Sequence, residues 1–102
     1  MPLPWPKRKA VESYFDNEAQ ALLMANDTRY GLATSVYTND LGRAQRLAQG
    51  LHMGMVWINC WMHRDLRTPF GGVKASGLGR EGGVDAMRFF SDCKNVSFGS
   101  LE

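Results

Sequence analysis

The sequence has few cysteines and histidines, and this scarcity excludes several kinds of site. Two cysteines, Cys60 and Cys93, make no disulfide framework, which favours two reduced thiols in a cytoplasmic protein. Cys60 with His52 and His63 does not supply the four convergent ligands of structural zinc. We therefore predict no metal site.

Long apolar runs and a strong charge of either sign are also missing. No run approaches the roughly 18 residues that span a bilayer, and no apolar stretch follows the basic residues near the N-terminus, so no secretory signal is expected. The net charge of +2 predicts no general attraction to nucleic acid or membranes. The 102 residues, 44% apolar and 22% charged, have the composition of one modest globular domain.

Proline is rare outside the N-terminus, since three of the four prolines fall in residues 1–10 together with Lys7-Arg8-Lys9. Proline at every second position blocks a helix and favours an extended arm. We interpret residues 1–10 as a disordered leader outside the folded part. The weaker alternative is a basic arm that binds nucleic acid or anionic lipid.

The middle of the chain predicts one strand–helix–strand crossover. A helix over residues 17–26, capped by Asp16 or Asn17, precedes a strand at 32–38. Asp40 can cap a helix over 41–51, and the apolar run 55–59 follows as a strand expected to be buried on both faces. This order predicts the α/β class with parallel strands.

The remainder of the chain predicts a long loop and two short elements. Residues 60–80 are punctuated by glycine and proline, and a connection of this length in a compact domain is usually functional or disordered. A helix is expected over 81–92, with acidic Glu81 favourable near its N-terminus, and a short strand over 95–98.

Residues 77–82 match the pattern G-x-G-x-x-G, which is typical of dinucleotide-binding turns. That site needs a buried strand running into the first glycine and a complete βαβ unit around it. No such strand precedes Gly77, and only 20 residues follow Gly82. We therefore predict that no nucleotide cofactor binds here.

Cys60 is a candidate nucleophile because it follows the second strand and lies three residues before His63. A catalytic thiol needs a positioned base and a setting that favours the thiolate. Nothing in the sequence orients His63 for this role. The preferred interpretation is a buried, structural cysteine, and the same interpretation applies to Cys93.

Two arginines give the loop after the second strand its own chemistry. Arg64 and Arg67 follow the carboxyl end of a strand, where ligands bind in α/β sheets. A guanidinium can grip a carboxylate or a phosphate with two parallel hydrogen bonds. The alternative is solvated surface arginines, one of them paired with Asp65.

Several blocks of this sequence resemble a known family. ANDTRYGL at 25–32 and PFGGVKASGLGRE at 69–81 resemble the C-terminal portion of NAD(P)-dependent aldehyde dehydrogenases, and the likeness extends over residues 11–98. Within that family, WINCWMHRDLRTPFGG is most similar to the dehydrogenases of 2-hydroxymuconic and 2-aminomuconic semialdehydes.

The resemblance implies a fold and a chemistry. Residues 11–93 would form part of the catalytic domain, with parallel strands and a crossover helix, and 94–102 an oligomerisation strand and tail. In this family a thiolate attacks the aldehyde, hydride passes to NAD(P), and water activated by a glutamate releases the acid. The nucleophile, the base and the nucleotide domain lie upstream of the matching region, so the resemblance implies no catalytic or cofactor-binding residue in this chain, and Cys60 falls on a non-catalytic position.

The resemblance also implies a substrate-binding role for residues 60–68, which match the family's substrate-anchor loop. Arg64 and Met62 are the substrate-binding candidates. Many relatives carry an aromatic residue at the position of Arg64, so we expect Arg64 to pair with a distal carboxylate of a muconic-type semialdehyde.

The expected partners are further copies of the chain or a full-length enzyme, with no nucleic acid and no membrane. Because the leader departs from the family, we expect the chain to be a truncated gene product, a fragment, or the result of a misassigned start. The alternative function is a non-catalytic interaction module that joins or caps oligomers of a full-length aldehyde dehydrogenase.

Overall fold

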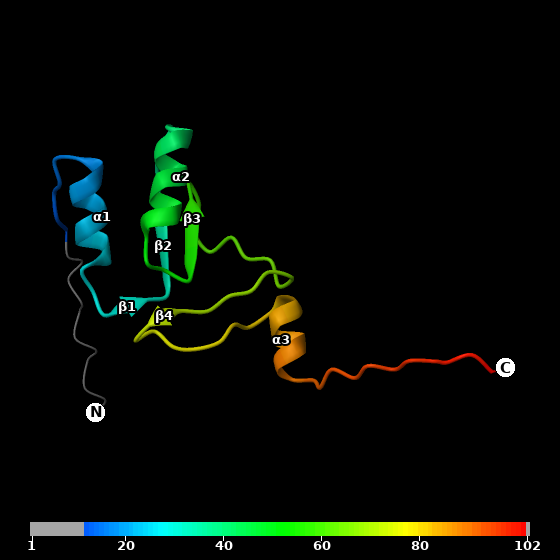
Figure 1. Ribbon diagram of the computed structural model, residues 1–102. Coiled ribbons are helices and arrows are strands. Elements are labelled where there is room, and N and C mark those ends of the chain that lie inside the picture. The colour runs from blue at the N-terminus through cyan, green and yellow to red at the C-terminus, as the bar shows by residue number, and fades with distance from the viewer. Residues whose placement is uncertain (1–11, 102) are drawn as a thin grey trace, which may run out of the picture.

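Two parallel strands joined by a helix form the centre of the fold in the computed structural model, which describes residues 12–101 (Figure 1). β2 (Ala33–Val36) leads through α2 (Leu41–Gly50) to β3 (Met55–Ile58). The parallel register runs from Ala33 opposite Met55 to Val36 opposite Ile58. The predicted crossover and the α/β class are confirmed, while the leader predicted at residues 1–10 lies outside the described residues.

α1 (Glu18–Asn26) begins and ends at side chains that satisfy backbone groups. Asn17 caps it, its Oδ1 accepting a hydrogen bond from the Gln20 amide at 2.9 Å. At the other end Asn26 donates to the Gly50 carbonyl and accepts from the His52 amide, both at 2.9 Å. One amide side chain therefore fastens the end of α1 to the end of α2.

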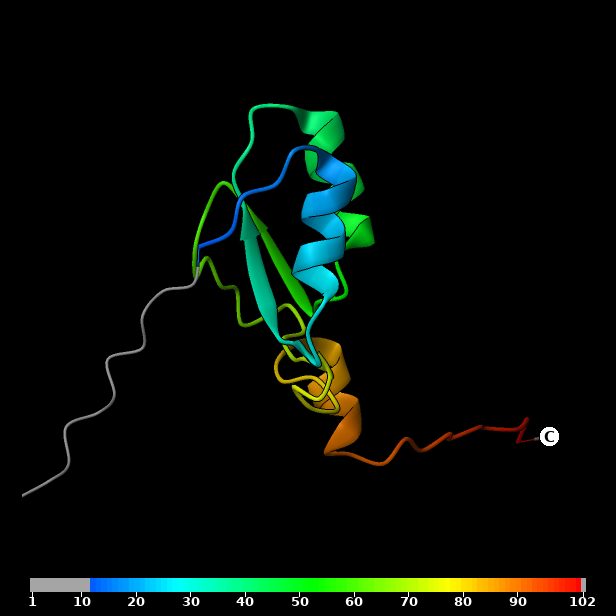
Figure 2. The same cartoon turned by 90° about the vertical axis from the view of Figure 1, so that its left-hand side faces the viewer.

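α2 packs on the sheet through a narrow apolar stripe. Asp40 caps it as predicted, accepting from the Arg43 amide at 3.0 Å. Ala44 and Leu51 are buried, whereas Leu41 at the start of the helix is 73% exposed. Figure 2 shows α1 and α2 on one side of the β2–β3 sheet, with the chain after β3 returning along the other side.

β3 is less buried than its apolar sequence predicts. Trp57 is 3% exposed, while Met55, Val56 and Ile58 are half-buried. Burial on both faces is the expectation for a central strand, but within residues 12–101 the sheet has only two strands, and a loop rather than a helix covers its second face. The prediction of burial on both faces was therefore wrong.

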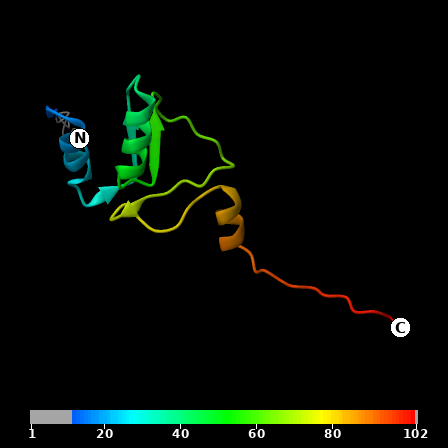
Figure 3. The same ribbon diagram turned by 45° about the horizontal axis from the view of Figure 1, so that its top comes forward.

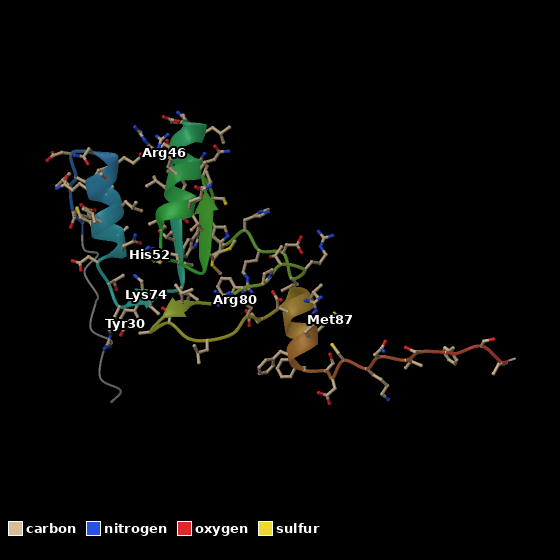
Figure 4. The ribbon with its side chains drawn as sticks, viewed as in Figure 1. Tyr30, Arg46, His52, Lys74, Arg80 and Met87 are labelled. Carbon is tan, nitrogen blue, oxygen red and sulfur yellow. The ribbon has the colours of Figure 1, made fainter. Side chains whose placement is uncertain are left out.

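A second, smaller pairing was not predicted. β1 (Tyr30–Gly31) pairs antiparallel with β4 (Val73–Lys74), although residues 30–31 read only as a helix break and 73–74 as loop. Lys74 reinforces the pairing, because its ammonium donates to the carbonyls of Asn26 and Thr28, both at 3.1 Å. Side chains of this region are drawn in Figure 4.

The C-terminal part differs from the prediction in two respects. α3 (Gly83–Phe89) is shorter than the helix expected over 81–92, because Glu81 is held in a bridge to Phe70. The strand expected over 95–98 is absent from the described chain. The backbone groups of residues 92–101 make no hydrogen bonds there, and the segment extends away from the body (Figure 3). An intersubunit strand stays a prediction, since it requires a second chain.

Candidate functional site

The candidate substrate loop leaves β3 through a residue in a left-handed conformation. Asn59 has φ of 55°, a region that asparagine tolerates better than most residues. Its side chain accepts from the Thr38 amide at 2.8 Å and donates to the Thr38 carbonyl at 2.9 Å. This double hydrogen bond fixes the direction in which residues 60–70 depart, away from the two helices.

Trp57 of β3 contacts the candidate substrate loop and holds it against the sheet. Its indole Nε1 donates to the His63 carbonyl at 2.8 Å. The Trp57 ring meets Trp61 edge-on at 5.3 Å between centroids and stacks with Phe70 at 6.5 Å. These three rings, called here the aromatic cluster, are attached to the sheet through the one buried side chain of β3.

Arg64 lies on the aromatic cluster and forms an ion pair. Its guanidinium carbon is 4.2 Å from the centroid of the Phe70 ring, and its Nη2 donates to Glu81 Oε1 at 2.8 Å. The Arg64 side chain is 33% exposed and that of Glu81 67%. Arg64 is therefore an exposed cation that is held in place by stacking on Phe70 and by its ion pair with Glu81.

Glu81 is as firmly placed as Arg64. Its amide donates to the Phe70 carbonyl at 2.7 Å, and its carbonyl accepts from the Phe70 amide at 2.8 Å. Gly82 follows with φ of 75°, and a Cβ there would approach the carbonyls of Leu66 and Thr68 to 2.9 Å. Glycine at this position lets the start of α3 pack against the substrate loop.

Arg67 and Met62, the neighbours of Arg64 in the loop, are placed differently. Arg67 forms an ion pair with Asp65, in which Nη2 donates to Oδ2 at 2.6 Å. The Arg67 side chain is 90% exposed. The hydrogen bond from Arg67 lowers the pKa of Asp65. The alternative of a surface arginine paired with Asp65 thus holds for Arg67. Met62, with φ of 57°, has an exposed side chain two residues before Arg64.

The two cysteines lie in different environments. Cys60 is half-buried, and its carbonyl accepts from Ser35 Oγ at 2.9 Å. Cys93 is exposed in the C-terminal segment, so its interpretation as a buried cysteine was wrong. In residues 12–101 neither sulfur takes part in a hydrogen bond. No group of three metal-ligating side chains occurs in the same part of the chain.

The glycine pattern at 77–82 does not fit a nucleotide. The strand before it, β4, is two residues long and antiparallel, and the helix after it has seven residues. Gly77 and Gly79 have φ of 131° and 74°, and a Cβ on either would meet nothing within 4 Å. A Cβ on Gly71 would clash with the Gly79 carbonyl, and one on Gly72 would come within 2.6 Å of the Ser76 Cβ, so these two glycines permit close packing, whereas Gly77 and Gly79 serve the turn itself.

An open hollow lies beside the aromatic cluster. It has a volume of about 560 Å³, and Phe70, Glu81, Ala86 and Phe89 contribute to its lining. Arg80 also lines it and donates to the carbonyls of Gly72 and Gly79 at 2.8 and 2.7 Å (Figure 4). Phe70 and Glu81 thus contact Arg64 and also line this hollow, whereas Arg64 itself does not line it.

Comparison with known proteins assigns the family. Residues 11–96 match the model described as the aldehyde dehydrogenase family. The chain belongs to this family. The resemblance inferred from the ANDTRYGL and PFGGVKASGLGRE blocks is confirmed. In the described part of the chain, no helix has the length and apolar character needed to cross a membrane.

Curated aldehyde dehydrogenases align with most of the chain. It is 51% identical over 83 residues to 2-aminomuconic semialdehyde dehydrogenase of Danio rerio, an alignment that covers 81% of this chain and 17% of that protein. It is 49% identical over 82 residues to 2-hydroxymuconic semialdehyde dehydrogenase of Pseudomonas putida, an alignment that covers 80% of this chain and 17% of that protein. The chain thus spans about a sixth of the length of the curated relatives it matches.

Solved structures agree with the fold. A betaine aldehyde dehydrogenase from Staphylococcus aureus in complex with NAD⁺ superposes with a TM-score of 0.72 at 43% identity, covering 74% of this chain and 15% of that one. An indole-3-acetaldehyde dehydrogenase in apo form superposes with a TM-score of 0.74 at 41% identity, covering 78% of this chain and 19% of that one. The α/β arrangement of this chain is therefore part of the aldehyde dehydrogenase fold.

Sequence reasoning singled out Arg64 but missed the residues that hold it. Glu81 was assigned only to the start of a helix, and Phe70 only to the glycine-rich loop. An ion pair across 17 residues has no local signature, because nothing in the intervening sequence fixes how the loop returns. The glycines after Glu81 were the available signal, since they indicate a close backbone approach.

Proposed function

We propose that this chain supplies the substrate-anchor loop of an aldehyde dehydrogenase that oxidises semialdehydes carrying a distal carboxylate, with NAD(P) as the hydride acceptor of the complete enzyme. The observation that carries the proposal is the Arg64 guanidinium, held 4.2 Å from the centroid of the Phe70 ring in the loop that follows β3. The relatives named for 2-aminomuconic and 2-hydroxymuconic semialdehydes support the substrate class.

The chemistry of Arg64 suits this class of substrate. A guanidinium forks onto a carboxylate with two hydrogen bonds, and the aromatic cluster excludes water from one face of the pair. A neutral aldehyde gains nothing from this cation, because it brings no charge to offset desolvation of the guanidinium. Arg64 thus orients an acid-bearing aldehyde by the end opposite to the reacting carbonyl.

The role proposed for this chain is binding and orientation rather than bond making. Two observations support this role: neither cysteine sulfur takes part in a hydrogen bond in residues 12–101, and the strand before the glycine pattern has only two residues. NAD(P), when bound to the complete enzyme, accepts the hydride. We expect the purified 102-residue chain to show no NAD-dependent aldehyde oxidation, measured as NADH absorbance, and a detectable rate would contradict this assignment.

The carboxylate role is tested by Arg64→Ala in a full-length aldehyde dehydrogenase that contains this segment. We expect kcat/KM for a muconic-type semialdehyde to fall on the order of 30-fold, equivalent to about 2 kcal/mol. The value for a neutral aldehyde of similar length should change by less than about threefold. Arg67→Ala is the matched control, since Arg67 is paired with Asp65 and exposed. Equal losses on both substrates would refute the role of Arg64.

A second function is favoured by the C-terminal segment. Residues 92–101 are extended and make no backbone hydrogen bonds in the described structure, and Val96 and Phe98 are 64% and 94% exposed. Such a segment can add as a strand to the sheet of another chain. The interaction module therefore predicts co-purification with a full-length muconic-type semialdehyde dehydrogenase. If the chain is a stable monomer that does not bind that enzyme, the interaction-module function is excluded.

A further inference from the structure

We propose that Glu81 is the internal counter-ion of Arg64 and determines how strongly this site binds carboxylates, an inference that rests on the proposed role of Arg64. The guanidinium is not an empty anion site. Its Nη2 already donates to Glu81 Oε1 at 2.8 Å, while its flat face rests on Phe70 at 4.2 Å. A ligand carboxylate must therefore displace Glu81 or share Arg64 with it.

The pair leaves part of the guanidinium available. Arginine presents five N–H donors in a rigid fork, and in residues 12–101 Arg64 makes one side-chain hydrogen bond, to a single oxygen of Glu81. A ligand that forks onto two guanidinium nitrogens makes one more hydrogen bond than Glu81 does. The existing pair thus favours bidentate carboxylates over weaker anions.

Displacement of Glu81 is inexpensive because its carboxylate has access to water. The Glu81 side chain is 67% exposed, so it regains hydration when it leaves Arg64. Its backbone stays in place, because both hydrogen bonds to Phe70 come from main-chain atoms. Phe70 therefore keeps supporting Arg64 while the Glu81 side chain moves away.

The arrangement makes Glu81 a specificity-determining residue. With Glu81 present, Arg64 has a partner in the absence of substrate. The Glu81 carboxylate competes with every incoming anion and lowers the affinity of Arg64 for it. Without that charge, Arg64 would bind carboxylates more tightly and less selectively. Exposed ion pairs have modest strength, so we expect an effect of about three- to fivefold on affinity.

The test measures binding of adipate to the 102-residue chain and its variants at constant ionic strength, with neutral adipamide as the ligand control. The readout is the backbone amide resonance of Phe70 in ¹⁵N NMR, because Phe70 contacts Arg64 and is present in every variant. Glu81→Gln should bind adipate about three- to fivefold more tightly than the unaltered chain. Asp85→Asn, the matched control, removes an acid of α3 that pairs with no cation in the described structure and should leave the affinity unchanged.

Arg64→Gln separates this inference from the proposed function. If it abolishes adipate binding while Glu81→Gln binds like the unaltered chain, the counter-ion role is overturned and the carboxylate role of Arg64 stands. If Arg64→Gln binds adipate normally, the carboxylate role itself is overturned. Absence of adipate binding to every variant, with circular dichroism showing them folded, would also overturn the inference, whereas binding by Glu81→Gln alone supports it.

Discussion

Among single residues, Gly54 makes the tightest backbone approach in the molecule's described part. A Cβ on Gly54 would clash with the Gly71 carbonyl and come within 3.1 Å of the Gly72 Cα. The backbone cannot easily withdraw, because the Gly54 amide donates to the Gly31 carbonyl at 3.0 Å. The residue before β3 thus touches the backbone at Gly71 and Gly72 without side chains between them.

Gly54→Ala should therefore destabilise the chain by about 2 kcal/mol or more, since a methyl group forced against backbone displaces both segments. Gly99→Ala is the control, because a Cβ at Gly99 meets nothing within 4 Å. It should change stability by less than about 0.5 kcal/mol. Urea unfolding followed by tryptophan fluorescence measures both, and coincident transitions for the two variants would refute the predicted contact.

For the helices and strands, the accuracy of sequence reasoning depended on how local the determining interactions were. α1 and α2 were predicted because Asn17 and Asp40 cap helices through hydrogen bonds three residues away. β1 and β4 were missed because two-residue strands have no pattern of their own, and Gly31 pairs with Val73, which lies far along the chain. The start of α3 was misplaced because the Glu81 backbone is bound to Phe70.

The same distinction applies to the candidate site. Arg64 was found because it follows a strand whose apolar run is readable from neighbouring residues. Its support by Phe70 and Glu81 depends on how a loop of about ten residues folds back, which only the tertiary packing decides. The burial of β3 was overestimated for a similar reason, since an apolar run does not reveal how many strands will flank it.

The helix-associated carboxylates predict a pH dependence of stability. A backbone hydrogen bond from Arg43 lowers the pKa of Asp40 below its usual 3.8, and a side-chain hydrogen bond from Arg46 lowers the pKa of Glu18 below 4.5. Because the pKa is lower in the folded chain, each carboxylate stabilises the fold at every pH above its unfolded-state pKa. This stabilisation is lost as the pH falls through its folded-state pKa. The thermal midpoint should be flat above about pH 5.5 and decline below about pH 4.5.

Helical circular dichroism during heating at pH 7, 5, 4 and 3 measures this decline. Asp40→Asn keeps a capping oxygen but removes one of the titrating groups, so its decline should be shallower than that of the unaltered chain. Combining it with Glu18→Gln should flatten the profile further. An identical decline in all three proteins would show that these carboxylates are not responsible.

Considered as a whole, the molecule is extended and exposes much apolar surface. Its Cα radius of gyration is 20.3 Å, whereas a compact domain of about 100 residues has about 13 Å. The buried hydrophobic residues of the described part are Ala44, Leu51 and Trp57. Large apolar side chains on α3 and beyond it, among them Met87 (Figure 4) and Phe98, are exposed. This surface favours association with another chain.

We expect the purified chain to self-associate, with an apparent mass in light scattering that rises with concentration. Val96→Lys combined with Phe98→Lys should lower that mass, because both side chains lie on one face of an extended segment. Asn95→Lys with Ser97→Lys adds the same charge to the opposite face and serves as the control. If the two double variants lower the apparent mass equally, net charge rather than the Val96–Phe98 face governs association.

The amide side chain of Asn26 has a consequence for how the molecule opens. It holds the Gly50 carbonyl and the His52 amide at once, so α1 cannot detach without releasing the connection between α2 and β3. Local unfolding proceeds in cooperative units, and amide hydrogen exchange reports their boundaries. The amides of α1 should therefore exchange at the rate of the crossover, although α1 itself contains no buried residue.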